Sequence, residues 1–433
     1  MSPTFRALAI RNYRIYAGGA LISNVGTWMQ RVAQDWLVLQ LTDNSGTALG
    51  ITTGLQLLPA LLLSPYAGVI ADRFPKRTVL SVTQIAMAAP AALLGVLAIT
   101  GMAVPWHVYV LAFAFGVATA FDAPARQSFV VEMVGQDDLS NAVGLNSASF
   151  NSGRMIGPAV AGVMIAALGS GATATGWVIL LNALSYLAVL ASLRVLDTRE
   201  LHPSLPAERG KGAVRDGIRY VRSRPDLVLI LATVFFVGTF GMNFQMTSAL
   251  MATEVFHKGA GAYGLLGSIM AVGSLGGALL AARRPRPRQR LVVGAAVAFA
   301  LVEVAAGLMP TYLTFAVILP LLGLTALTMV TSANATIQLT VNPQMRGRVS
   351  ALYLMIFLGG TPLGAPFIGW IGEVMGARWT LIAGGLITLV GTLVALAMFI
   401  HRTGLVVRPR FGRRLTWEVS TRAEPAGVAV RRR

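Results

Sequence analysis

The sequence predicts an all-α integral membrane protein with twelve transmembrane helices in two pseudo-symmetric six-helix bundles. Its 433 residues are 55% hydrophobic and only 12% charged, and the mean hydropathy is +0.67. A soluble domain usually carries about a quarter charged residues. Apolar runs of roughly 20 residues, the length that crosses the hydrocarbon core of a bilayer, recur throughout the chain. Composition therefore excludes an ordinary soluble domain.

The spans follow from where the apolar runs stop at charged, Pro or Gly residues. We expect them at residues 15–40, 49–70, 78–100, 105–129, 140–168, 174–195, 226–252, 260–282, 291–309, 312–339, 349–373 and 379–401. The chain then divides into a cytoplasmic N-terminus (1–14), an N-terminal six-helix bundle (15–195), a cytoplasmic linker (196–225), a C-terminal six-helix bundle (226–401) and a basic cytoplasmic tail (402–433).

Positive charge is distributed unevenly along the chain. If the N-terminus is cytoplasmic, 30 of the 35 Lys and Arg residues fall in cytoplasmic segments, and the outer loops hold only Lys258 and Arg378. Lys and Arg accumulate on the cytoplasmic side of membrane proteins, so this ratio predicts a multi-pass protein of the cell membrane with both termini inside. The same asymmetry accounts for the net charge of +18 without nucleic acid as a partner.

The residue types present exclude several kinds of chemistry. The sequence contains no Cys, which excludes disulfides, thiolate metal sites and Cys nucleophiles. Its four His residues lie far apart, in predicted loops or at helix ends, so we expect no metal site. The first apolar segment is long and carries Arg31 and Asp35, which is not typical of a cleavable signal peptide.

Two segments outside the spans are rich in basic residues. Residues 213–222 have the pattern of a short amphipathic helix on the inner membrane surface, and a solvated linker is the alternative. The tail is interrupted by Pro and Gly, so we expect it to be disordered and attracted to anionic lipid headgroups.

The turn after the second span combines charged residues with helix-ending ones. Gly68 allows close packing of the helix end, Pro75 stops the helix, and the charges place the turn at a membrane surface. The pattern resembles G-x-x-x-D-R-x-G-R-R/K, the signature loop between helices 2 and 3 of the major facilitator superfamily. The matching residues are Gly68, Asp72, Arg73, Lys76 and Arg77, and a plain cytoplasmic turn is the alternative.

The fifth span carries small residues at regular intervals. Its spacing resembles the antiporter motif of the same superfamily, G-x8-G-x3-G-P-x2-G-G, with Ala161 in place of one Gly. The matching residues are Gly144, Gly153, Gly157, Pro158 and Gly162. Small residues allow another helix to approach closely, and Pro158 bends the helix because it removes a hydrogen bond. In the superfamily this helix takes part in closing the central cavity on the outer side, and the motif is associated with export. Ordinary helix packing is the alternative.

Charged residues within the first and fifth spans form the leading candidate site. Arg31 and Asp35 lie one turn apart and can pair within their helix. Asn151 and Arg154 share a face of the fifth span. Asp35 of the first span could also pair with Arg154 across the bundle. Charges inside a bilayer are costly when unpaired. They therefore indicate either substrate or proton handling or a buried ion network, and Asp122 completes this set of transport and coupling candidates.

The superfamily resemblance also implies a latch on the inner side. Asp122 ends the fourth span near the level of the turn, where an acid commonly pairs with a base of that turn. Asp72 would then face Arg346 and Arg348 and the helix N-terminus at the start of the eleventh span, which would hold the two halves together. Glu303, in the ninth span, does not belong to this scheme, and we expect it to pair with a neighbouring helix rather than to act in transport.

The resemblance extends over residues 5–402. Segments 11–16, 23–39, 121–127 and 343–349 are most similar to the drug:proton antiporter branch that includes the enterobactin exporter and macrolide efflux proteins. This resemblance implies a monomeric secondary transporter. Such a transporter would export drug- or siderophore-like amphipathic small molecules by proton antiport and alternating access. No cofactor is expected. The chain has no G-x4-G-K-S/T nucleotide-binding loop, so a proton gradient would supply the energy.

Two alternatives stay open. An importer or a lipid translocase on the same fold is the nearer one, and the pattern of the fifth span favours export over it. A membrane-embedded enzyme or a receptor is the more distant one. The absence of Cys, of a His pair within a span and of a large soluble domain argues against that class.

Overall fold

The computed structural model describes residues 3–135, 137–202, 213–282, 289–410 and 416–421, and helices dominate these ranges. A short 3-10 helix, η1 (Pro3–Ala9), precedes the first half, and another, η2 (Thr198–Glu200), follows it. The first half consists of α1 (Arg11–Leu41), α2 (Gly46–Arg73), α3 (Lys76–Ile99), α4 (Pro105–Val134), α5 (Leu139–Ala167) and α6 (Ala172–Val195).

The second half contains two interrupted spans. The seventh is built from α8 (Pro225–Phe236), a π-helical turn η3 (Val237–Gly241), α9 (Phe244–Leu250) and a second π-helical turn η4 (Met251–Val255). The eleventh consists of α13 (Pro343–Gly359) and α14 (Thr361–Met375). The others are α10 (Ala260–Ala282), α11 (Gln289–Gly307), α12 (Tyr312–Thr340) and α15 (Arg378–Thr403).

The described chain contains twelve spans. Ten of its segments are long and apolar enough to cross a membrane. The helices α1 and α5, with 31 and 29 residues, are just as long but carry more polar side chains. Polar residues in a spanning helix are tolerated where they face the protein interior rather than lipid. The two most polar spans are therefore the first places to look for a functional site.

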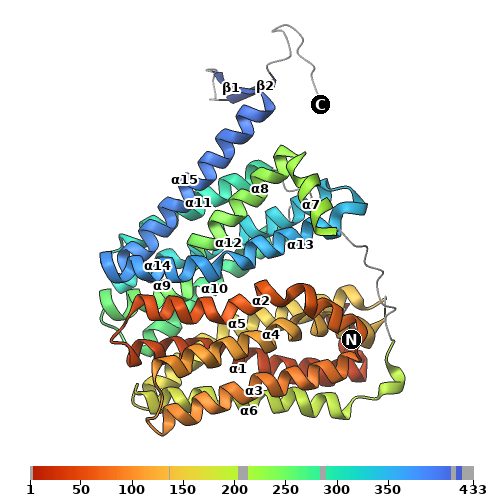
Figure 1. Cartoon of the computed structure of the whole chain (residues 1–433), viewed down its shortest axis with the longest axis vertical. Helices are drawn as coiled ribbons and strands as arrows, with labels where there is room; N and C mark the ends of the chain where they lie inside the picture. The colour runs from red at the N-terminus through yellow and green to blue at the C-terminus, as the bar shows by residue number, and fades with distance from the viewer. Residues whose placement is uncertain (1–2, 136, 203–212, 283–288, 411–415, 422–433) are drawn as a thin grey trace.

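The helices form two bundles that meet through two helix pairs. Within the first bundle, α1 packs on α5 and α6, and α3 packs on α4 and α6; within the second, α11 packs on α12 and α15. Between the bundles, α2 packs along α14 and α5 along α10 (Figure 1). All-helical architecture with two such bundles confirms the predicted fold class.

Glycines allow the close approach at both inter-bundle contacts. A Cβ atom on Gly46 would stand 2.6 Å from the carbonyl oxygen of Gly369, and one on Gly50 would stand 2.9 Å from the carbonyl carbon of Ala365. On the other side, a Cβ on Gly162 would stand 2.6 Å from the carbonyl oxygen of Ala260. Because these neighbours are backbone atoms, only glycine permits the observed spacing.

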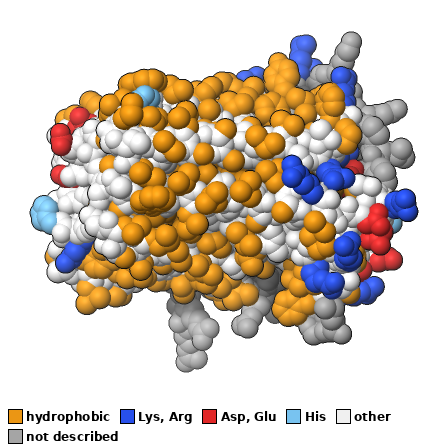
Figure 2. All heavy atoms as spheres, turned by 90° about the horizontal axis from the view of Figure 1, so that it is seen from below, with side chains coloured by type: hydrophobic (Ala, Val, Ile, Leu, Met, Phe, Trp, Pro, Cys, Tyr) orange, Lys and Arg blue, Asp and Glu red, His pale blue; other side chains and the backbone are white. Residues whose placement is uncertain are grey.

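The molecule has two ends with different charge. Lys and Arg side chains gather at one end, which we call the basic end, whereas few lie at the other (Figure 2). The inter-bundle contacts involve the first turns of α2 and the last turns of α14, next to Glu373 and remote from the basic end. We call this the closed end. In Figure 1 the two bundles lie closest where α14 passes α2.

The structure departs from the sequence-based boundaries by more than three residues at three helix ends, and it differs in the tail. The helix α1 begins at Arg11, four residues before the expected start. The helix α4 continues to Val134, five residues beyond the expected end, and α13 begins at Pro343, which is favoured at the first turn of a helix. The tail was expected to be disordered, but its described part forms an antiparallel hairpin of β1 (Leu405–Arg410) and β2 (Thr416–Thr421). Valines in both strands favour extended backbone over disorder.

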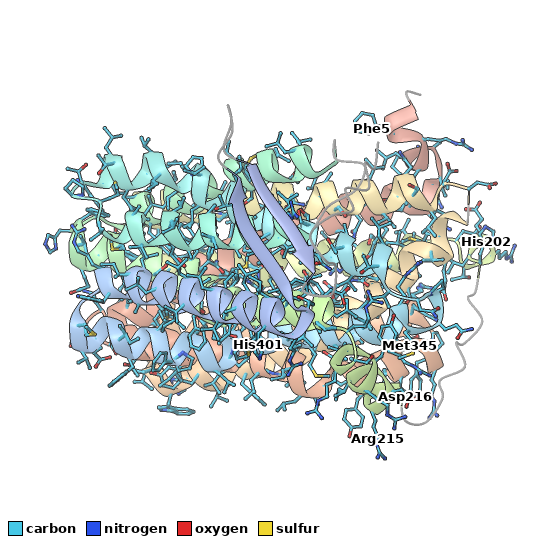
Figure 3. All side chains as sticks on the ribbon, turned by 90° about the horizontal axis from the view of Figure 1, so that it is seen from above. Phe5, His202, Arg215, Asp216, Met345 and His401 are labelled. Carbon is cyan, nitrogen blue, oxygen red and sulfur yellow. The ribbon has the colours of Figure 1, made fainter. Side chains whose placement is uncertain are left out.

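The linker contributes a helix at the basic end. The helix α7 (Ala213–Arg222) covers the segment for which the sequence predicts an amphipathic helix, and it packs on α13. Arg348 of α13 contacts Asp216 of α7, with Nη1 3.3 Å from Oδ2. Figure 3 shows Asp216 and Met345 at this end, next to each other. The contact attaches the linker to the second bundle.

Candidate functional site

A cavity of about 390 Å³ lies inside the first bundle. Helices α1, α4 and α5 supply most of its wall, and α3 adds one residue. The polar lining residues are Asn24, Thr27, Arg31, Thr119, Asp122, Arg126, Gln127, Asn146, Ser147 and Asn151. Met87, Ala123 and Phe150 supply the apolar part. Three of the predicted residues, Arg31, Asp122 and Asn151, therefore line one space.

Two arginines share one indole ring beside this cavity. The guanidinium carbon of Arg31 lies 4.8 Å from the ring centroid of Trp28, and that of Arg154 lies 5.9 Å from it. Among the described residues no carboxylate pairs with either arginine, and Nε of Arg31 has no hydrogen-bond partner. The expected ion pairs of Asp35 with these arginines are therefore absent. The indole face stabilises both cations instead, as cation–π contacts do.

Asp35 contacts the opposite bundle. Its side chain is buried, and Oδ2 accepts a hydrogen bond of 2.8 Å from the hydroxyl of Tyr263 on α10. The ring of Tyr263 also stacks on Trp36, with centroids 6.5 Å apart. Sequence reasoning missed Tyr263, because a partner 228 residues away leaves no local signal. The acid of the first bundle is thus tied to the inter-bundle contact.

The glycines of α5 serve two different contacts. A Cβ on Gly153 would stand 2.9 Å from the carbonyl carbon of Asn24, and one on Gly157 would stand 2.6 Å from Cβ of Trp28, so both hold α1 close. Gly162 faces α10, as described above, and the carbonyl of Pro158 lies against Gly264 of α10. Nothing lies within 4 Å of a Cβ on Gly144.

Asp122 does not pair with the turn between α2 and α3. It accepts hydrogen bonds from Arg126 on its own helix at 2.9 and 3.0 Å, and from Thr83 and Gln84 at 2.8 Å each. Lys76 of the turn pairs instead with Glu132, at 3.1 Å. The prediction chose the wrong acid because α4 extends further than expected. Ten residues of helix separate the two acids, about 15 Å along the axis.

The remaining residues of the predicted inner latch lie at the basic end, and no hydrogen bond or ion pair joins those whose side chains are described. Arg73 and Arg346 are exposed, Gly68 and Arg77 are half-buried, and Arg348 pairs with Asp216 rather than with an acid of the first bundle. Asp72 lies in α2, but its side chain is outside the part of the structure that is described. The latch therefore stays a prediction.

A buried polar network links α1 to α6. Asn182 donates to Gln30 and, at 3.1 Å, to the hydroxyl of Tyr186, which in turn lies 3.2 Å from Thr27 of the cavity wall. Asn24 donates to Ser149 of α5 at 3.0 Å. These bonds fix the face of α1 that carries Arg31.

Comparison with known proteins assigns the family. Residues 2–423 match the family model described as transmembrane secretion effector (MFS_3). The chain belongs to this family. It is therefore a membrane transporter of the major facilitator superfamily and not an enzyme.

Relatives of this chain include named transporters. It is 25% identical over 378 residues to the staphyloferrin A transporter of Staphylococcus aureus, covering 86% of this chain and 92% of that protein. It is 28% identical over 402 residues to the multidrug efflux pump Tap of Mycobacterium tuberculosis, covering 89% and 90%. Its fold is similar to an inward-facing structure of a bacterial homolog to the human lysosomal transporter Spinster. The TM-score is 0.67 at 16% identity, over 93% of this chain and 97% of that one.

Proposed function

We propose that this transporter exports amphipathic small molecules across the cell membrane in exchange for protons. Relatives that include a multidrug efflux pump and a staphyloferrin A transporter, aligned over most of their length, support this. The cavity combines Phe150 and Met87 with amides and Arg31, which suits a substrate that has both apolar and polar parts. The two arginines without acidic partners favour a substrate with a negative or electron-rich group.

The observation that carries the proposal is the hydrogen bond between Asp35 and Tyr263. It joins a buried acid of one bundle to a hydroxyl of the other. An ionised carboxylate accepts a hydrogen bond more strongly than a neutral carboxylic acid does. The proton on Asp35 therefore changes the stability of the inter-bundle contact. Such a difference between states is what lets a bound proton drive a conformational change.

In the proposed cycle, the basic end faces the cytoplasm, as the distribution of Lys and Arg favours. Loss of a proton from Asp35 to the cytoplasm strengthens its bond to Tyr263 and keeps the closed end shut. Substrate binds beside Arg31, one turn from Asp35, and weakens the hydrogen bond between Asp35 and Tyr263. The closed end then opens and the substrate is released outside. Asp35 then takes a proton from outside before the protein returns.

The turn with Gly68, Asp72, Arg73, Lys76 and Arg77 has a second role in this proposal. When the cytoplasmic side of the protein closes, this turn contacts the start of α13, where Arg346 and Arg348 lie. An acid beside these bases and beside a helix N-terminus is electrostatically favourable. The turn is thus a conformational latch and not a substrate site.

The first prediction concerns Asp35→Asn in reconstituted vesicles. The amide cannot exchange a proton, so proton-driven uphill efflux should be lost, at least 100-fold in rate, whereas downhill substrate exchange should continue. Both are measured in the same vesicles with a panel of amphipathic compounds. Asp43→Asn, an exposed acid next to the end of α1, is the matched control and should keep both activities. Full-rate uphill efflux by Asp35→Asn with the usual pH dependence would move the coupling role elsewhere, first to Asp122.

A further inference from the structure

The second bundle contains a buried carboxyl group that the proposed cycle does not use. Glu303 lies on α11, one helical turn before Gly307, and only 1% of its surface is exposed. Its Oε2 atom has no hydrogen-bond partner among the described residues, so the expected pair with a neighbouring helix is absent. An ionised carboxylate without a partner is very costly to bury. Something must therefore neutralise it.

Two glycines pack against this carboxyl group. A Cβ on Gly241, in the π-helical turn η3, would stand 3.0 Å from Oε2 of Glu303, and a Cβ on Gly384, on α15, would stand 3.2 Å from Oε1. Neither position therefore leaves room for a side chain that could approach the carboxyl group. No described group within hydrogen-bond distance donates to Oε2, and an ionised carboxylate would need such donors.

No described cation is close enough to neutralise Glu303. The charged or titratable residues of the elements packed on α11 lie at helix ends: Asp226, Arg290, Tyr312, Arg378, His401 and Arg402. Arg290 lies 13 residues earlier on the same helix, about 20 Å along the axis. Arg378 directs its Nη1 to the carbonyl oxygens of Gly307 and Met309, at 3.0 and 2.6 Å. The described residues therefore provide no ion-pair partner for Glu303.

We propose that Glu303 binds a proton and is a second proton-carrying group, separate from Asp35. A proton neutralises a single carboxylate and needs no cavity. A divalent metal ion would need six or more oxygens at about 2.3–2.6 Å, usually with several carboxylates. The described residues contain no group of three His, Cys, Asp or Glu side chains. The arrangement thus fits a proton better than a metal ion.

The surroundings of Glu303 connect it to the closed end. The turn η3 that covers Glu303 packs on α14, where Gly360 and Gly364 leave no room for a side chain against Thr239. The same helix packs on α2 at the closed end through its glycine contacts. If Glu303 exchanges its proton and η3 shifts, α14 will transmit the shift to that contact. Proton binding at Glu303 is therefore linked to opening of the closed end.

Infrared difference spectroscopy tests this inference directly. The probe is the C=O stretch of a protonated carboxyl group, recorded on purified protein in lipid nanodiscs as the pH is raised. The Asp35→Asn background removes the signal of the acid in the proposed cycle. The buried acids Asp122 and Glu132, which pair with Arg126 and Lys76, are the same in all variants and cancel in the comparison. We expect a band that disappears at high pH and is absent from Asp35→Asn/Glu303→Gln. Asp35→Asn/Glu254→Gln, which changes an exposed carboxyl group of η4, is the matched control and should keep the band.

Two outcomes would overturn the inference. One is the absence of any band that depends on Glu303 at all pH values, in both the wild-type and Asp35→Asn proteins. The other is loss of the band on adding sodium chloride, but not choline chloride, at constant pH, which would make the site a sodium site. The readout needs no substrate, so a failure of the Asp35 proposal and a failure of this one are distinguishable.

Discussion

At the scale of single residues, the first bundle stabilises its buried charges in two different ways. Arg31 and Arg154 lie over the ring of Trp28, whereas Asp35 binds a tyrosine of the second bundle. A cation over an aromatic ring keeps its charge without an acidic partner. Asp35 thus makes no direct ion pair with either arginine and forms its hydrogen bond with the other bundle.

Tyr263→Phe tests the role of that contact. Loss of a hydrogen bond to a charged group costs about 1.5–3 kcal/mol, so the closed end should open roughly 10- to 100-fold more often. Spin labels at positions 44 and 375, near the ends of α2 and α14, report the distance across it. Tyr312→Phe is the matched control, because its hydroxyl donates to Ala262 within one bundle, at 2.9 Å. An equal response of both variants would contradict the proposal that the hydrogen bond between Asp35 and Tyr263 keeps the closed end shut.

The sequence pointed to Arg31, Asp122 and Asn151, which the structure brings to one cavity, but not to the pairings of the predicted residues. Their role in transport stays a prediction. Residue types within the spans identified Arg31, Asp35 and Arg154, since charges there are rare. The partners depend on tertiary packing that spacing along one helix does not encode, as with Tyr263. Asp122 was predicted to pair with the turn because the end of α4 was placed five residues too early, which corresponds to about 7 Å along the helix axis. In the structure, Lys76 of the turn pairs with Glu132.

At the scale of elements, helix boundaries were largely predictable and helix irregularities were not. Most spans begin and end within three residues of the expected positions, because charged and turn residues mark membrane surfaces. The π-helical turn η3, with the sequence Val-Gly-Thr-Phe-Gly, contains no proline to announce it. Such turns are set by packing, here on α14 and α15. The surroundings of Glu303 could not be predicted for the same reason.

Gly50→Ala tests the glycine contact between α2 and α14. The new methyl group would meet backbone atoms of Ala365 and Pro366, which cannot move aside as a flexible side chain can. Overpacking costs about 1–3 kcal/mol, so the closed end should open and the spin-label distance should increase. Gly18→Ala, on an exposed position of α1 with nothing within 4 Å, is the control and should leave the distance unchanged. An unchanged distance in Gly50→Ala would show that the contact does not limit opening.

At the scale of the whole molecule, charge and conformation give a consistent description. The bundles are in contact at the closed end, away from the basic end, and the fold is similar to that of an inward-facing transporter. Apolar side chains are exposed in the halves of α2 and of the α13–α14 span that lie nearer the basic end, Leu62 and Leu354 among them. This is the arrangement expected of a protein whose cavity opens at the basic end.

The last prediction concerns the orientation of the basic end in the membrane, and the absence of Cys makes the test clean. Single cysteines at positions 205 and 287 lie in strongly basic connections, so we expect them to be protected from a membrane-impermeant thiol reagent in intact cells. Positions 103 and 260 lie in or next to connections that carry little positive charge, but Ala103 and Ala260 are buried. Cysteines at the neighbouring positions 102 and 259, which are exposed, should therefore react. Permeabilised cells are the control, because the reagent then reaches both sides of the membrane and all four positions should be labelled. Reaction at position 205 in intact cells would invert the topology, and the proposed direction of export would then be wrong.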